Sequence, residues 1–197
     1  MGMGEPLHNR ESVVRAVNLL MDDRGANVSA RRITISTAGM ADDIARLGAD
    51  RWVNLTLSLS ATTDAVRDQI MPINRKHPIA KLMKTLRELS LPRHRRITIA
   101  YVLLAGVNDT DDDARRLAKL VAGLPVKINL IPFNERPELA YRRPTRARVE
   151  AFQAILRAKN LNALIRESRG RDISAACGQL ATESLRDRVA CAGESGP

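Results

Sequence analysis

Strand-like and helix-like segments alternate along almost the whole chain, with short connections between them. Segments rich in β-branched residues or with alternating apolar residues predict strands at residues 31–37, 54–60, 95–104, 126–133 and 161–167. Helical spacing of apolar residues predicts helices at residues 11–23, 40–47, 64–70, 78–91, 111–122 and 145–159. This alternation predicts an α/β fold in which right-handed crossovers wind parallel strands into an open sheet or a barrel.

Polar residues stand where several predicted strands end. Residues 1–7 read as the end of a strand that runs into a Gly-Glu-Pro turn, which offers the carboxylate of Glu5. Ser36, Ser58 and Asn134 close later strands. Each serine taken alone fits an ordinary strand-end turn. Because ligands gather at the carboxyl ends of parallel strands, the four residues together predict a site for one polar small molecule.

The length and hydropathy of the chain indicate one domain. Its 197 residues, of which 44% are hydrophobic, can bury one substantial core. We expect the domain to cover residues 1–181 and residues 182–197 to form a polar, disordered tail. No run of about 18 apolar residues and no signal peptide are present, so we expect no membrane association and a cytoplasmic location.

The net charge points to a polyanionic partner. Lys and Arg number 32 against 22 Asp and Glu, which gives +10, while aromatic residues at 3% argue against a base-stacking platform. Arginines cluster at residues 93–96, 142–148 and 166–171. We expect the first cluster to be a solvated surface and the other two, beside the long loop at residues 134–144, to face RNA.

The chain has two cysteines, Cys177 and Cys191, which cannot form a disulfide framework and are expected to stay reduced. Cys177 lies after two alanines, where the residue type alone fits a small buried side chain. Cys191 lies in the polar tail, and we assign it no role.

Six segments together resemble one known family. They are MGMGEPL, RRITISTAGM, NLTLSLSATTDAVRDQIMPIN, RITIAYVLLAGVNDTDDDARRLAKL, VKINLIPFN and RGRDISAACGQLA. In this order they closely resemble the radical S-adenosylmethionine (SAM) methyltransferases that methylate C2 of an adenine in 23S rRNA, and often in tRNA. The resemblance covers residues 1–181 and implies a parallel (β/α) partial barrel. The sibling methyltransferases that act on C8 of adenine share this layout.

The resemblance implies a role for particular residues. The positions that match SAM contacts of the family are Gly4, Glu5, Ser36, Ser58, Leu59, Ser60 and Asn134. Ser60 stands where the family has a histidine. Cys177 matches the cysteine that the family methylates. The family needs this cysteine because an aromatic C–H carbon is not nucleophilic, so a sulfur carries the methyl group to the adenine. Hydrogen abstraction from the thioether methyl then gives the carbon radical that adds to the ring.

The chain also departs from the family. Family members hold a [4Fe–4S] cluster on a Cys-x-x-x-Cys-x-x-Cys loop before the Gly-Glu-Pro turn, and this sequence has neither that loop nor any other set of metal ligands. An N-terminal RNA-binding domain, the first barrel strand and a second catalytic cysteine are absent as well. We therefore expect a barrel truncated at its N-terminal edge, poorly stable, prone to association and inactive alone. A flavodoxin-type electron donor is implied for the complete enzyme only.

Two other functions remain open at this stage. A module that binds SAM or RNA without redox chemistry would use the same carboxyl-edge residues and the positive charge. An inactive remnant would use neither.

Overall fold

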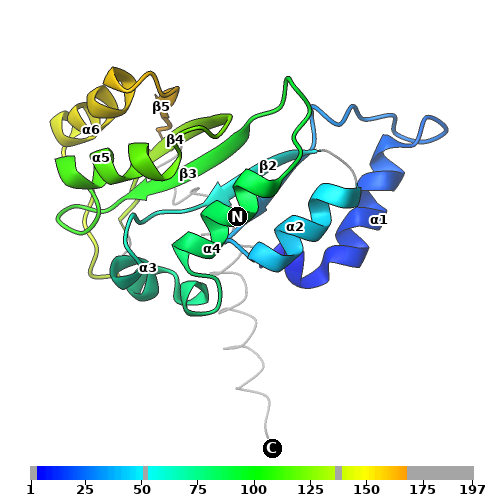
Figure 1. The fold of residues 1–197 in the computed structure, drawn as a ribbon, viewed down its shortest axis with the longest axis horizontal. Coiled ribbons are helices and arrows are strands. Elements are labelled where there is room, and N and C mark those ends of the chain that lie inside the picture. The colour runs from blue at the N-terminus through cyan, green and yellow to red at the C-terminus, as the bar shows by residue number, and fades with distance from the viewer. Residues whose placement is uncertain (1–3, 51–52, 136–138, 168–197) are drawn as a thin grey trace, which may run out of the picture. The chain divides into compact units, whose positions relative to one another are not determined.

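The computed structural model describes residues 4–50, 53–135 and 139–167 (Figure 1), without the side chains of residues 48–50. The chain divides into two units, of which Glu5–Arg166 holds all the helices and strands described below. Gly4 and Glu167 belong to the other unit. No helix of the described part is long and apolar enough to cross a membrane.

Five parallel strands form one sheet in which the spatial order equals the chain order. They are β1 (Thr34–Thr37), β2 (Asn54–Ser58), β3 (Ile97–Leu103), β4 (Val126–Pro132) and β5 (Ala163–Ile165). A sequential order, with every crossover in the same sense, winds the chain as a barrel does and leaves β1 and β5 as the edges among the described strands. The predicted α/β partial barrel is confirmed.

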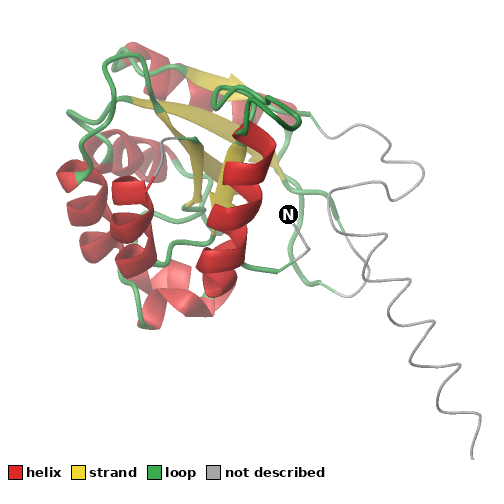
Figure 2. Ribbon diagram, turned by 90° about the vertical axis from the view of Figure 1, so that its right-hand side faces the viewer, coloured by secondary structure: helices red, strands yellow, loops and turns green. Residues whose placement is uncertain are grey.

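Helices occupy each crossover. The chain opens with η1 (Pro6–Asn9) and α1 (Arg10–Met21), and the crossovers carry α2 (Ala41–Asp50), α3 (Asp64–Ile70) with η2 (Pro72–Arg75) and α4 (Ile79–Glu88), α5 (Asp111–Leu120), and α6 (Arg146–Ala158). Helices α2 to α6 lie on one face of the sheet (Figures 1 and 2), where α2 packs on α4 and α5 packs on α6. None of helices α2 to α6 covers the other face of the sheet.

The core lies between the sheet and this helical layer. Its buried side chains alternate along the strands and recur at helical spacing, among them Leu57, Ile99, Tyr101, Leu130, Ile44, Leu82, Leu117 and Phe152. The ring of Tyr101 on β3 packs against that of Phe152 on α6, with centroids 5.4 Å apart. Burial raises the pKa of Tyr101 far above its ordinary value, so the hydroxyl stays protonated and donates to the carbonyl oxygen of Asn108.

Element boundaries differ from the predicted ones at a few places. The strand predicted from residue 31 begins at Thr34, because residues 30–32 form a turn. Strand β2 ends at Ser58 and not at residue 60, because Ser60 adopts a positive φ of 53°. The strand predicted at the start of the chain involves residues 1–3, which lie outside the described part, and Pro6–Asn9 forms a 3₁₀ turn.

Candidate active site

The face of the sheet away from the helices carries small polar side chains on β1 and β2, and apolar ones such as Val102 and Ile131 toward the ends of β3 and β4. On β2, Leu55 and Leu57 join the core, and the residues that alternate with them, Asn54, Thr56 and Ser58, are half-buried. Parallel register aligns Ser36, Thr56 and Thr98 in one row and Ser58, Ala100 and Asn129 in the next. The alternation predicted for residues 54–60 is confirmed for Asn54–Ser58 and ends there, because Leu59 and Ser60 are both buried. Small polar groups line the face on which Ser36 and Ser58 lie.

The carboxylate of Glu5 lies at the carboxyl end of β1. Its Oε2 accepts a hydrogen bond from the backbone N–H of Ala38 at 2.7 Å, and its Oε1 accepts one from Leu7 at 3.1 Å as the cap of η1. Two backbone donors thus fix the orientation of the carboxylate, and each oxygen keeps a further lone pair. The structure confirms that Glu5 meets the end of the strand that contains Ser36.

A buried arginine, Arg67, joins the ends of β1 and β2, although no sequence motif marks it. The side chain of Arg67, on α3, is fully buried. Its Nη2 donates to the carbonyl oxygens of Ala38 at 2.6 Å and Ser58 at 3.2 Å, and its Nε donates to that of Leu59 at 3.0 Å. One guanidinium therefore fixes the backbone on which Glu5 rests and the backbone that carries Ser58.

Carboxylates around Arg67 keep it charged. Its Nη1 donates to Oδ1 of Asn74, whose Nδ2 donates in turn to Asp64 at 2.9 Å and Asp68 at 2.7 Å. Burial lowers the pKa of Arg67 to about 10, against the opposing effect of the two aspartates, so the guanidinium is protonated at neutral pH. From the sequence alone, Arg67 cannot be told from a solvent-exposed arginine, because it lies in a short helix and no motif marks its side chain as buried.

Gly39 lies where the chain packs closely around Arg67. It has φ of 110°, and an added Cβ would lie 3.1 Å from Nη2 of Arg67 and from both methyl carbons of Leu82. Gly39→Ala should lower the free energy of unfolding by about 2–3 kcal/mol through backbone strain and this contact. Gly123→Ala is the matched control, with φ of 77° and no atom within 4 Å, and should cost only about 1 kcal/mol. Urea unfolding measures the free energy of unfolding of both variants. Equal losses in the two would contradict close packing at Gly39.

A second buried side chain, Asn108, joins β2 to β3. Its Nδ2 donates to the carbonyl oxygens of Ser60 at 2.6 Å and Val102 at 2.7 Å, and its Oδ1 accepts the N–H of Leu104 at 2.7 Å. The hydroxyl of buried Ser60 accepts the N–H of Val102 at 3.3 Å, and the side chain of Leu59 is fully buried in the core. Leu59 and Ser60 thus support the strand ends from within. In the sequence, Asn108 lies between Gly106 and Thr110 in a segment typical of a turn, and no motif marks its side chain as buried.

Asn134 follows the end of β4 and is half-buried. The loop after it is held by Arg143, whose Nη1 donates to the carbonyl oxygen of Phe133 at 3.2 Å and whose N–H donates to Oε1 of Glu135 at 2.9 Å. The rings of Phe133 and Tyr141 meet edge to face at 6.3 Å. Arg143 therefore helps to shape the loop beside Asn134, in addition to the RNA contact predicted for its cluster.

Several predicted site residues fall outside what can be placed. Cys177, Cys191, Arg169 and Arg171 lie outside the described residues. Gly4 has φ of 94° but belongs to the other unit, so its position relative to Glu5–Arg166 is not described. Within the described ranges no group of three or more His, Cys, Asp or Glu side chains could hold a metal ion.

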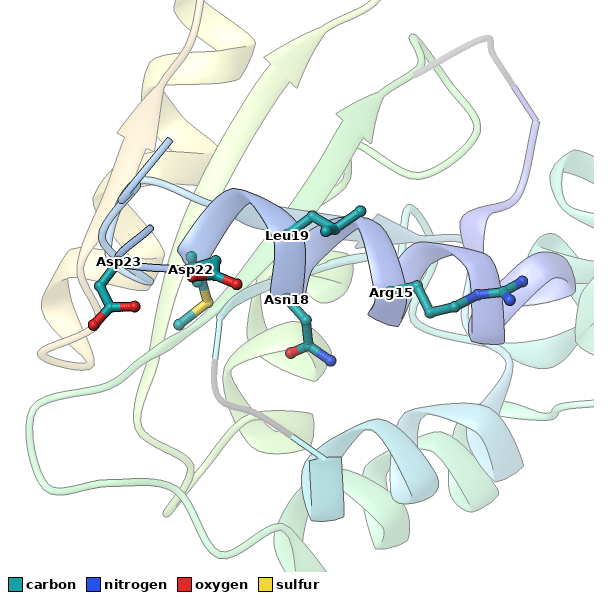
Figure 3. A pocket seen from close by; sticks show the side chains of 6 residues that line it. Arg15, Asn18, Leu19, Asp22 and Asp23 are labelled. Atoms are coloured by element: carbon teal, nitrogen blue, oxygen red, sulfur yellow. The ribbon is translucent and has the colours of Figure 1, made fainter. Parts of the chain in front are cut away.

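A hollow of about 710 Å³ lies along the C-terminal half of α1 (Figure 3). Its lining is Arg15, Asn18, Leu19, Met21, Asp22 and Asp23, none of which is a predicted site residue. The side chain of Leu19 is 70% exposed beside it. The carboxyl edge of the sheet remains the candidate active site.

A sequentially ordered parallel sheet with one helical layer and polar groups at its carboxyl edge is the architecture of a parallel (β/α) partial barrel. No family model matches the chain. It is 53% identical over 180 residues to the dual-specificity RNA methyltransferase RlmN of Geobacter sulfurreducens, which covers 91% of this chain and 50% of the relative. It is 54% identical over 183 residues to the RlmN of Anaeromyxobacter sp. (strain Fw109-5), a match that covers 93% of this chain and 48% of the relative.

A solved structure shows the same relationship. The crystal structure of a radical SAM methyltransferase from Sphaerobacter thermophilus superposes with a TM-score of 0.86 at 46% identity, over 91% of this chain and 53% of that one. The chain belongs to the RlmN family of radical SAM dual-specificity RNA methyltransferases. It spans about half the length of the curated relatives it matches.

Proposed function

We propose that this chain is the SAM-binding part of an RNA methyltransferase that methylates C2 of an adenine in 23S rRNA, and in tRNA, in the cytoplasm. The observation that carries the proposal is 53% identity over 91% of the chain to a protein named as a dual-specificity RNA methyltransferase. The polar carboxyl edge supports it independently, because a fixed carboxylate and strand-end hydroxyls suit a ligand with an ammonium group and hydroxyls.

SAM fits the residues at this edge. The carboxylate of Glu5, held by two backbone donors, would bind the ammonium group of SAM. Gly4 is assigned to SAM by its match to the family alone. Ser36, Ser58 and Asn134 would bind its other polar groups, and Leu59 and Ser60 would support them through the backbone. When bound, SAM supplies an electrophilic methyl group. Cys177 would be the nucleophile whose sulfur receives a methyl group and holds it for the adenine.

The [4Fe–4S] cluster of the family does not fit this chain's own residues. Such a cluster needs three or four thiolates, and the 197 residues contain two cysteines. We therefore propose that the chain alone is not catalytic, and that the cluster and a flavodoxin-type donor belong to the complete enzyme. The same shortage favours the second candidate function, a module that binds SAM or RNA without redox chemistry.

A chimera tests the proposal. This chain would replace the matching half of the Geobacter sulfurreducens relative, in a host that lacks its own enzyme, and the nucleosides of 23S rRNA would be measured by mass spectrometry. We expect 2-methyladenosine, and none when Cys177→Ser is introduced. A product of 8-methyladenosine would identify a C8 methyltransferase. Absence of any methyladenosine, with SAM binding to the chain retained in calorimetry, would favour the binding module.

A further inference from the structure

A basic hollow lies at the amino-terminal ends of β2, β3 and β4, the opposite edge of the sheet from the candidate active site. It measures about 810 Å³, and its polar lining is Arg31, Asn54, His94, Arg95, Arg96 and Lys127. None of the described residues that line it is acidic. The residues come from the turn before β1, the start of β2, the connection before β3 and the start of β4. The arginine cluster at residues 93–96, which we expected to be a solvated surface, thus lines one hollow together with Arg31 and Lys127 from two distant segments.

The base of this hollow is built by hydrogen bonds. Nη1 of Arg95 donates to Oδ1 of Asn54 at 2.9 Å and to the carbonyl oxygen of Ala30 at 3.4 Å. Nδ2 of Asn54 donates to the carbonyl oxygen of Arg31 at 2.7 Å. These bonds hold the turn that carries Arg31 against the start of β2, so the position of Arg31 is set by the sheet.

The remaining charges of the hollow are available to a ligand. Arg31, Arg96 and Lys127 are exposed, and none of them makes an ion pair with a residue in the described ranges. Cations of the helical layer differ, since many are paired, as in Lys81 with Asp42 and Arg146 with Glu150. Unpaired cations gathered without an acidic neighbour create a positive potential that attracts a polyanion.

The arrangement of these three cations favours a strand of phosphates. Lys127 aligns with Thr98 of β3, Arg96 immediately precedes β3, and Arg31 lies against Asn54 of β2. Adjacent strands are about 4.8 Å apart, so the charges form a row across three strands, roughly 10 Å long. A compact phosphate ligand needs donors that converge, whereas an open row of cations suits successive phosphates of one chain.

We propose that this basic hollow binds the sugar–phosphate backbone of RNA. The inference rests on the proposed function, because it takes RNA as the polyanion. The seven residues of β3 separate the hollow from the carboxyl edge by roughly 20 Å, so the contact would hold the RNA substrate away from the adenine that reacts. Contacts of this kind position an RNA without reading its sequence.

The test uses the 197-residue chain with Arg31→Gln, Arg96→Gln and Lys127→Gln combined. Affinity for a short labelled RNA hairpin is measured by fluorescence anisotropy over a range of KCl concentrations. We expect affinity to fall at least about tenfold. The magnitude of the slope of log K against log[salt] should fall by about 2–3, because binding with three fewer phosphate contacts releases fewer counterions. Thermal melting checks that the variant is folded.

A matched control removes the same charge elsewhere. Arg75→Gln, Lys119→Gln and Arg157→Gln change three exposed cations of the helical layer that make no ion pair with a described residue. We expect less than about a threefold change. Equal losses in both triple variants, or none in either, would overturn the proposal. So would tight binding of inorganic triphosphate that depends on the same three residues while RNA affinity does not.

SAM titration separates this inference from the proposed function. The hollow variant should bind SAM as the unmodified chain does, because none of its substitutions lies at the carboxyl edge. If the unmodified chain bound RNA but not SAM, the assignment of the SAM site would be wrong. The RNA measurements would still test whether the hollow binds RNA.

Discussion

Arg67→Met is expected to lower the free energy of unfolding by at least about 4 kcal/mol. Methionine fills part of the space but donates no hydrogen bond, so the carbonyl oxygens of Ala38, Ser58 and Leu59 lose their bonds from a buried guanidinium. The carbonyl oxygen of Leu59 keeps the N–H of Ala61, whereas each buried acceptor left unpaired costs about 1–3 kcal/mol. Asp64 and Asp68 also lose their counter-charge, which adds to the loss. Urea unfolding followed by circular dichroism measures the effect.

Two further variants keep this prediction testable where Arg67→Met does not fold. Arg67→Lys retains the charge but not the planar set of donors, and should lose about 2–3 kcal/mol. Arg46→Met, on an exposed side chain 3.9 Å from Asp43, should change stability by less than about 0.5 kcal/mol. A loss below about 1 kcal/mol in Arg67→Met would show that the guanidinium does not hold the two strand ends.

The sheet could be predicted from the sequence because its signals are local. Alternating leucines at residues 54–60 and the β-branched run at 95–104 each indicate a strand without knowledge of their neighbours. Residues 64–70 form the helix as predicted, because Thr63 caps it and Met71 ends it. The 3₁₀ turns at Pro6–Asn9 and Pro72–Arg75 were missed, since one turn is too short for a periodic pattern.

The candidate site was predictable only in part. That Glu5 would meet the end of the strand containing Ser36 followed from the rule that ligand groups gather at carboxyl ends, and the bond to Ala38 confirms the placement. Arg67 and Asn108 were missed because burial decides their roles. A polar residue in a short helix or turn gives the same sequence signal whether water or a buried carbonyl is its partner.

These two missed residues explain how the edge keeps its shape. Arg67 fixes the end of β2 to that of β1, and Asn108 fixes the following residues to β3. The side chains proposed to bind SAM are therefore carried by backbone that has little freedom to move. A site held in this way spends less free energy on ordering when the ligand binds.

Asn108→Asp is expected to cost about 3–5 kcal/mol at pH 7, although the two side chains have nearly the same shape. A carboxylate oxygen would replace the Nδ2 that donates to the carbonyl oxygens of Ser60 and Val102, so two attractions become repulsions in a fully buried place. Leu104 would keep its acceptor. Urea unfolding at pH 7 measures the loss, and Asn18→Asp, on the exposed surface of α1, should cost about 0.5 kcal/mol or less.

The pH dependence of this variant gives a sharper test. Burial beside two carbonyl oxygens should raise the pKa of the introduced carboxyl above that of an unfolded aspartate. The destabilisation relative to the unmodified chain should then be smallest near about pH 4, where the protonated group can donate one hydrogen bond, and should grow as the pH rises and the proton is lost. A difference in stability that stayed constant between about pH 4 and pH 7 would show that repulsion at the strand ends is not its cause.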